Sequence, residues 1–122
     1  MASQKCVLIY DDDLEILTLC KIILKRENYH VETCKICDHI IDDIKKYKPD
    51  IILMDLWIPK IGGEEAIKLM RHDPYGKDIP VLLFSANDEI KKISKSTKVN
   101  GYIQKPFDIN IFKAEIEKWI EE

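Results

Sequence analysis

The chain has 122 residues, of which 46% are hydrophobic and 34% are charged, and its formal net charge is −3 at pH 7. This size and composition predict one globular domain over residues 1–122, with residues 1–4 as a flexible N-terminus, and they exclude an intrinsically disordered chain. The slightly negative charge favours neither nucleic acid nor an anionic membrane as a direct partner.

The predicted elements alternate between strand and helix. Residues 1–5 contain no signal-peptide core, and no later apolar run approaches the roughly 20 residues of a membrane span, so we expect a cytoplasmic protein without membrane insertion. Short apolar runs predict strands, and apolar residues at helical spacing between capping and turn residues predict helices. In chain order we predict strand 6–10, helix 13–28, strand 30–34, helix 38–47, strand 51–54, helix 64–72, strand 81–84, helix 88–99, strand 101–104 and helix 108–120.

This strict alternation of strands and helices predicts an α/β fold. Parallel strands joined by helical crossovers form a sheet with helices on both faces. The third strand, Ile51–Met54, is a run of four apolar residues between turn signals, as expected of a strand that is buried on both faces. The fold class is therefore a doubly wound five-stranded parallel sheet.

Polar residues follow four of the five predicted strands. Because the carboxyl ends of parallel strands meet at one edge of the sheet, where α/β proteins bind ligands, these side chains should converge. Three carboxylates in this set would repel one another without a cation, and their hard oxygens are the ligands that Mg²⁺ prefers. The convergent residues are Asp11 and Asp12 after the first strand, Asp55 after the third, Ser85 after the fourth and Lys105 after the fifth.

The same residues resemble the receiver domain of two-component response regulators, including the chemotaxis-type single-domain regulators. The resemblance rests on four motifs that occur in the family's order across nearly the whole chain. They are the acidic pair Asp11-Asp12, the Asp-x-x-x-Pro segment Asp55–Pro59, Ser85-Ala86 and Lys105-Pro106. The resemblance implies the flavodoxin-like (βα)5 receiver fold and a role in phosphorelay signalling.

The resemblance also assigns a role to each site residue. Asp55 would accept the phosphoryl group, and it should be ionised if a cation lies near. Ser85 and Lys105 would bind the phosphoryl oxygens. Mg²⁺ or Mn²⁺ would be held by Asp11, Asp12, Asp55 and the backbone carbonyl of Trp57, whose side chain would then overhang the site.

The partners that the resemblance implies are a histidine kinase or a histidine phosphotransfer protein as donor, and a downstream protein. The chain would carry out self-phosphorylation and autodephosphorylation but would not be an enzyme with a separate substrate. Ser85 and Tyr102 would form the switch that transmits phosphorylation to the surface. The chain could be a single-domain regulator or part of a larger regulator or hybrid kinase.

Four features depart from the family pattern, and one of them is Leu14, which stands where Pro often opens the first helix. Gly62 stands where the family usually has Asp, and Ser85 replaces the commoner Thr. The stretch between Ser85 and Lys105 is shorter than usual, so the helix predicted there should be short or loosely attached. Lys91, Lys95 and Lys98 would form a basic stripe on this helix, which is either a solvated face or a surface that attracts an acidic partner.

Other functions fit the residues less well. A phosphatase of the haloacid-dehalogenase type needs Asp-x-Asp and a cap, but here a helix follows the acidic run directly. A docking module that is independent of phosphorylation would have lost some of the polar residues. A flavodoxin-like cofactor binder would have glycines and hydroxyls in the first loop instead of three acids.

Cys34 and Cys37 match half of a zinc or redox motif, but the sequence offers no second pair of ligands. We therefore interpret these two cysteines, together with Cys6 and Cys20, as buried thiols.

Overall fold

The computed structural model describes residues 4–120, so residues 1–3 of the predicted flexible terminus lie outside the described residues. Gln4, the fourth residue of that terminus, donates a hydrogen bond from Nε2 to Oδ1 of Asn28 (3.1 Å). In chain order the elements are β1 (Cys6–Tyr10), α1 (Leu14–Arg26), β2 (His30–Cys34), α2 (Ile40–Tyr47), β3 (Ile51–Met54), α3 (Gly63–Arg71), β4 (Val81–Ser85), α4 (Ile90–Ser96), β5 (Gly101–Gln104) and α5 (Ile109–Trp119).

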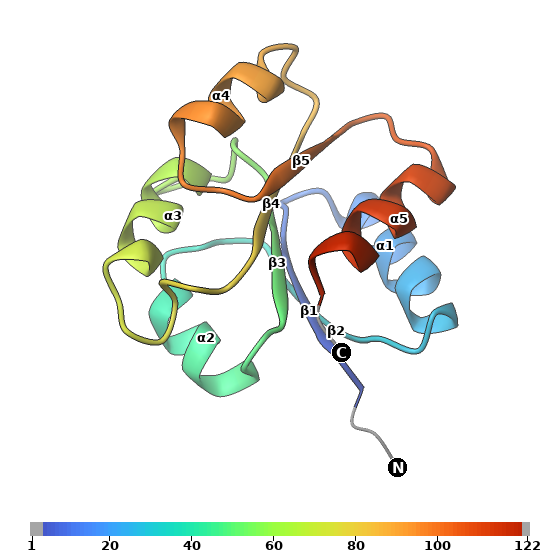
Figure 1. The fold of residues 1–122 in the computed structure, drawn as a ribbon, viewed down its shortest axis with the longest axis horizontal. Coiled ribbons are helices and arrows are strands. Elements are labelled where there is room, and N and C mark those ends of the chain that lie inside the picture. Colours follow the sequence, from blue (N-terminus) through green and yellow to red (C-terminus); the bar gives the residue numbers. More distant parts are fainter. Residues whose placement is uncertain (1–3, 121–122) are drawn as a thin grey trace.

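The five strands form one parallel sheet in the order β2-β1-β3-β4-β5. Helices α1 and α5 cover one face, and α2, α3 and α4 cover the other (Figure 1). The predicted fold class is therefore confirmed. No helix within residues 4–120 is long and apolar enough to cross a membrane.

The sheet separates two hydrophobic cores. Alternate residues of each inner strand face opposite sides, so Ile52 and Met54 pack toward α2, α3 and α4, while Ile51 and Leu53 pack toward α1 and α5. All four residues of β3 are fully buried. This double burial explains why β3 contains only apolar residues.

Two aspartates begin the helices that pack on the α1/α5 face. Oδ1 of Asp13 accepts hydrogen bonds from the backbone N–H groups of Glu15 and Ile16, and Asp108 caps α5 in the same way. The predicted starts of these two helices are therefore correct.

Two helices on the other face are shorter than predicted. Helix α2 begins at Ile40 instead of Asp38, and His39 at its N-cap provides no side-chain hydrogen bond. Helix α4 spans Ile90–Ser96 instead of residues 88–99, and Thr97 is already extended. Lys98 therefore lies outside α4, and the predicted stripe of three lysines on one helix face is wrong for this residue. The expectation of a short fourth helix is confirmed.

Candidate functional site

The edge of the sheet formed by the carboxyl ends of the strands brings Asp11 and Asp55 together. The two residues directly follow the neighbouring strands β1 and β3. The backbone N–H of Asp55 donates to the carbonyl of Tyr10 (3.0 Å), and that of Asp11 donates to the carbonyl of Cys34 (3.1 Å). These bonds extend the strand ladders by one residue, so both carboxylates start from a rigid backbone.

Asp12 completes a cluster of three carboxylates. Asp11, Asp12 and Asp55 each place one oxygen within 4.8 Å of the other two. Asp11 and Asp55 are buried, whereas Asp12 is exposed. Three hard oxygen donors at this spacing, with one side open to water, fit a divalent cation such as Mg²⁺.

Lys105 places a positively charged side chain next to the carboxylate cluster. Its Nζ forms ion pairs with Oδ2 of Asp11 and with Oδ2 of Asp55, the latter at 3.5 Å. The ammonium also lies 4.7 Å from the centre of the Phe84 ring, which contributes a cation–π attraction. The Lys105 side chain is therefore fixed beside the two buried carboxylates and is not free in solvent.

The environment of Asp55 disfavours its charge. Burial raises the pKa of the Asp55 carboxyl above its ordinary value, and the negative charge of Asp11 raises it further. Lys105 and the backbone N–H of Trp57, which donates to Oδ1 of Asp55 (3.3 Å), act in the opposite direction but do not reverse the shift. A divalent cation at the cluster would favour the ionised form of Asp55.

Ser85 and Trp57 lie at the same edge. Ser85 is the last residue of β4 and is fully buried, and its Oγ accepts a hydrogen bond from the backbone N–H of Asn87 (3.2 Å). The indole of Trp57 is 67% exposed. The structure therefore groups Asp11, Asp12, Asp55 and Lys105 in one cluster, and it places Ser85 and Trp57 at the same edge of the sheet.

Tyr102 lies on β5, where it pairs with Leu83 of β4, while Ser85 pairs with Gln104. The ring is half-buried and packs against the core beneath α2, α3 and α4. It also lines a cavity of about 510 Å³, together with residues of α4 and α5. Tyr102 thus lies two residue pairs away from Ser85 along the β4–β5 ladder, and it has open space beside it.

Two contacts at the site were not predicted from the sequence. The N–H of Asn87 fixes the Ser85 hydroxyl, and the backbone of α3 approaches Asp55 so closely that a Cβ atom at Gly63 would lie 2.2 Å from the Asp55 carbonyl oxygen. The sequence of the loop after β4 does not indicate the Asn87 contact. The glycine at position 63, next to Gly62 where the family usually has Asp, could have indicated the close approach to Asp55.

The cysteines form no metal site within residues 4–120. All four are free thiols, and none belongs to a group of three metal-ligating side chains in this part of the chain. Cys6, Cys20 and Cys37 are buried as predicted, whereas Cys34 is only partly buried. Burial raises the pKa of the Cys34 and Cys37 thiols to about 11, which disfavours the reactive thiolate.

Comparisons with known proteins agree with the geometry. The family model described as the response regulator receiver domain matches residues 7–117. Sporulation initiation phosphotransferase F of Bacillus subtilis is 28% identical over 122 residues, which cover 98% of this chain and 96% of that protein. Several other curated relatives are much longer, and the chain spans only 18% to 48% of their length.

Two solved structures show the same fold. A putative response regulator from Chloroflexus aurantiacus has a TM-score of 0.90 at 23% identity, covering 97% of this chain and 98% of that one. The receiver domain of a sensor histidine kinase from Pseudomonas aeruginosa, solved with a magnesium ion coordinated in the active site cleft, has a TM-score of 0.87 at 22% identity, with the same coverage. From its match over residues 7–117 and its acidic cluster, we conclude that the chain belongs to the response regulator receiver domain family.

Proposed function

We propose that Asp55 is the phosphoryl acceptor of this receiver domain, with Lys105 and Ser85 binding the transferred group. The observation that carries the proposal is the charge arrangement at the strand ends. Three carboxylates lie within 4.8 Å of one another, and one ammonium contacts two of them. A cluster with two buried carboxylates is costly to the fold unless it serves a reaction or a cation.

The reaction needs a carboxylate nucleophile and positive charge around the phosphoryl oxygens. A carboxylate oxygen of Asp55 would form the new P–O bond as the P–N bond to the donor imidazole breaks. The nucleophile has no proton to lose, so no general base is required. Lys105, with its Nζ 3.5 Å from Oδ2 of Asp55, is close enough to pair with a phosphoryl oxygen bound there.

Ser85 would provide a second contact on the β4 side of Asp55. Its Oγ accepts the Asn87 N–H, which leaves the hydroxyl hydrogen available to donate to a phosphoryl oxygen. Asp11, Asp12, Asp55 and the backbone carbonyl of Trp57 would hold Mg²⁺, or Mn²⁺, which also accepts oxygen ligands. When bound, the cation neutralises charge on the phosphoryl oxygens.

Receiver domains accept phosphoryl groups from histidine kinases or phosphotransferases, and their chemistry is modification of their own aspartate. For this chain we propose a cytoplasmic domain over residues 1–122 that receives phosphate from such a donor and passes the signal to a downstream protein. Ser85 and Tyr102 would carry the change from Asp55 to the surface. The two residues lie on the paired strands β4 and β5, two residue pairs apart, which supports this part of the proposal.

The proposal is tested by incubating the protein with acetyl phosphate and Mg²⁺ and measuring its intact mass. We expect one phosphoryl adduct, which is absent after EDTA treatment and in Asp55→Asn. Asp13→Asn is the matched control: Asp13 lies outside the carboxylate cluster, and Asn retains the N-cap. An equal adduct in Asp55→Asn would mean that another residue accepts the phosphate.

A further inference from the structure

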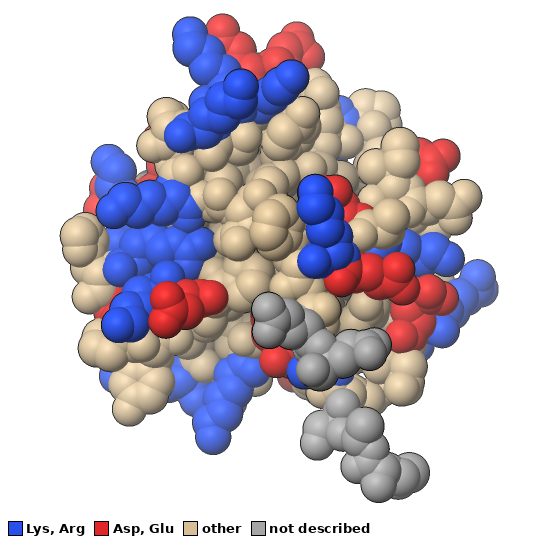
Figure 2. All heavy atoms as spheres, viewed as in Figure 1, with Lys and Arg blue, Asp and Glu red and all other residues tan. Residues whose placement is uncertain are grey.

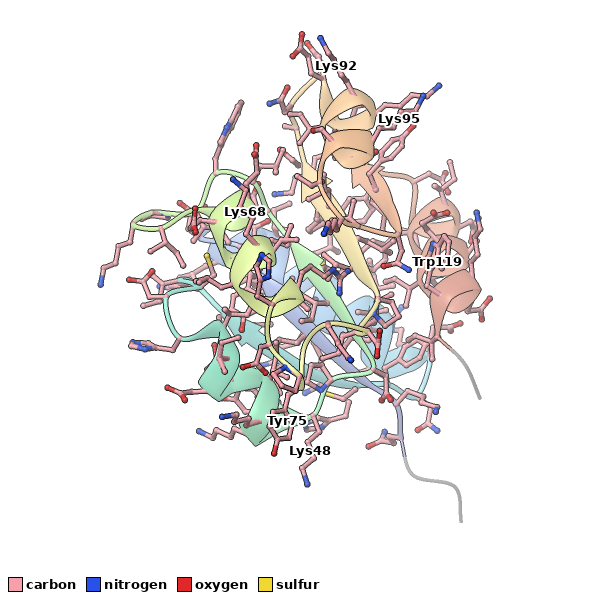
Figure 3. The ribbon with its side chains drawn as sticks, turned by 60° about the vertical axis from the view of Figure 1, so that its left-hand side comes forward. Lys48, Lys68, Tyr75, Lys92, Lys95 and Trp119 are labelled. Carbon is pink, nitrogen blue, oxygen red and sulfur yellow. The ribbon has the colours of Figure 1, made fainter. Side chains whose placement is uncertain are left out.

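A further cavity lies at the opposite edge of the sheet from Asp55. It has a volume of about 560 Å³, within the usual range of ligand-binding pockets. Tyr75 and Lys48 lie together at this end of the molecule, and Lys92 and Lys95 on α4 lie at the other end (Figure 3). We call this cavity the α2 pocket, and it is lined by Ile44, Lys45, Lys48, Pro49, Tyr75 and Ile79.

The α2 pocket is separated from the carboxylate cluster by the length of β3. Pro49 lies just before this strand, and Asp55 follows its last residue. At about 3.3 Å per residue, the two positions are on the order of 15–20 Å apart. A molecule in the α2 pocket would therefore not contact Asp55 or Lys105.

The α2 pocket combines an apolar floor with an ordered cationic rim. Ile44, Pro49 and Ile79 provide apolar lining. The ring of Tyr75 is 65% exposed, and Nζ of Lys45 lies 5.2 Å from its centre. This cation–π contact orients an aromatic side chain and a charge toward the same cavity before any partner binds.

Arg71 fixes the loop that forms one wall of the α2 pocket. Its Nη1 donates to the carbonyls of Gly76 (3.1 Å), Lys77 (3.2 Å) and Ile79 (2.7 Å), and its Nε donates to the carbonyl of Lys98 (2.7 Å). These bonds join the loop before β4 to the turn before β5. The wall is therefore held by hydrogen bonds from one side chain, and the backbones of Lys77 and Lys98 both lie next to Arg71.

The charges near the α2 pocket are mainly positive, and Lys and Arg gather over the α2 and α3 side of the molecule (Figure 2). Among the acids there, Asp50 accepts the backbone N–H of Cys6 (2.7 Å), and Asp73 accepts that of Tyr75 (2.8 Å). Asp78 interacts with the guanidinium of Arg71. The lysines at positions 45, 48 and 77 are exposed and form no ion pair within residues 4–120.

We propose that the α2 pocket is a docking site for an acidic segment of a partner protein that carries one apolar side chain. The apolar side chain would lie on Ile44, Pro49 and Ile79 beside the Tyr75 ring, and flanking carboxylates would pair with Lys45 and Lys48. Tyrosine is one of the residues that most often contribute a large share of the binding free energy at protein interfaces. The lysines around it would add electrostatic complementarity to an acidic partner. The apolar floor favours a peptide over nucleic acid, whose backbone would offer this floor only phosphates and sugars.

The experiment measures fluorescence anisotropy of a fluorescein-labelled peptide that has one leucine between pairs of glutamates. We expect saturable binding that is about tenfold weaker for the Lys45→Glu/Lys48→Glu double variant, because two attractive contacts become repulsive. Tyr75→Ala should also weaken binding. Lys92→Glu makes the same kind of charge change on α4, far from the pocket, and should leave the affinity within about twofold, because salt screens distant exposed charges.

Three results would overturn the proposal. The first is equal binding by the double variant and the wild type, and the second is an equal loss in Lys92→Glu, which would indicate general charge attraction. The third is a DNA duplex that binds more tightly than the peptide through Lys45 and Lys48. Because the α2 pocket is remote from Asp55, peptide affinity should be the same in Asp55→Asn, so this test does not depend on the phosphorylation test.

Discussion

At the scale of single residues, Lys105 controls the charge balance of the site. Its ammonium pairs with both Asp11 and Asp55, and the three groups are largely removed from water. Burial nevertheless keeps the pKa of Asp55 above its ordinary value. One lysine therefore does not neutralise the charge of three carboxylates. This excess of negative charge is the physical reason to expect a divalent cation.

Trp57 should report binding of that cation. If its backbone carbonyl is a ligand, the adjacent indole will sense the change in charge, and we expect Mg²⁺ to alter the tryptophan fluorescence of the wild type. The response should be lost in Trp57→Phe, measured by titration with MgCl₂. Trp119→Phe is the control, because Trp119 ends α5, donates from Nε1 to Glu115 (3.4 Å) and lines a cavity beside Gly101 at the start of β5, away from the carboxyl edge of the sheet. An undiminished response in Trp57→Phe would place the indole away from the cation.

At the scale of elements, the strands were predictable and some helix ends were not. Strands β1, β2, β3 and β5 have the predicted bounds, because each is a short run between turn residues, and β4 is longer by Ser85 alone. The early end of α4 accompanies a tertiary contact, the bond from Arg71 Nε to the Lys98 carbonyl. A contact between residues 27 positions apart cannot be read from the local sequence pattern that predicts a helix.

The site shows the same division. The positions of Asp11, Asp55 and Lys105 follow from strand order, because each residue directly follows a predicted strand. The Asn87 bond to Ser85 depends on the conformation of a loop, which composition does not specify. The basic α2 pocket was also not predicted, because its lining comes from α2, the segment between α2 and β3, and the loop before β4.

Gly63 should couple the start of α3 to the position of Asp55. A Cβ atom there would lie 2.2 Å from the Asp55 carbonyl oxygen, and a Cβ at Gly76 would lie 2.7 Å from the Met70 carbonyl oxygen. Gly63→Ala and Gly76→Ala should each destabilise the fold by about 1–3 kcal/mol, measured by urea denaturation. Only Gly63→Ala should also slow phosphorylation by acetyl phosphate, because only this clash moves the acceptor. Equal phosphorylation rates in the two variants would show that the Asp55 backbone does not need this close approach.

The pair of β4 and β5 should carry the switch. If Ser85 moves toward a phosphoryl oxygen, space opens beside β5, and the half-buried ring of Tyr102 can turn inward. We expect the ring resonances of Tyr102 to shift in NMR spectra on addition of beryllofluoride, a phosphoryl mimic, and to shift much less in Ser85→Ala. Resonances near Asp55 serve as the control for binding of the mimic. If they change while Tyr102 does not, the signal leaves through another surface.

At the scale of the whole molecule, one sheet supports two functional edges. Its carboxyl edge holds the acidic cluster, and its amino edge holds the cationic rim of the α2 pocket. The two cores on its faces share β3 and both neighbouring strands, so they should unfold together. A single buried group on a central strand can therefore report the stability of the entire domain.

Cys6 at the start of β1 is such a group. Burial, assisted by Asp50 and Glu32, raises the pKa of its thiol from 9.0 to about 11. Below pH 9 the thiol is protonated in both folded and unfolded protein, and above this value only the unfolded protein ionises readily. Stability from this group is therefore present below about pH 9 and is lost as the pH rises to about 11, with a loss on the order of 1 kcal/mol at about pH 10.

The loss should be visible as a pH-dependent difference between variants in urea denaturation. Cys6→Ala removes the thiol, so the wild type should lose on the order of 1 kcal/mol more than this variant between about pH 7 and about pH 10. Val7→Ala is the matched control, because Val7 is the next residue of β1, is fully buried and cannot ionise. Its difference from the wild type should stay constant across the same range. A constant difference for Cys6→Ala as well would mean that the Cys6 thiol ionises as readily in the folded protein as in the unfolded chain, and that the start of β1 is open to water.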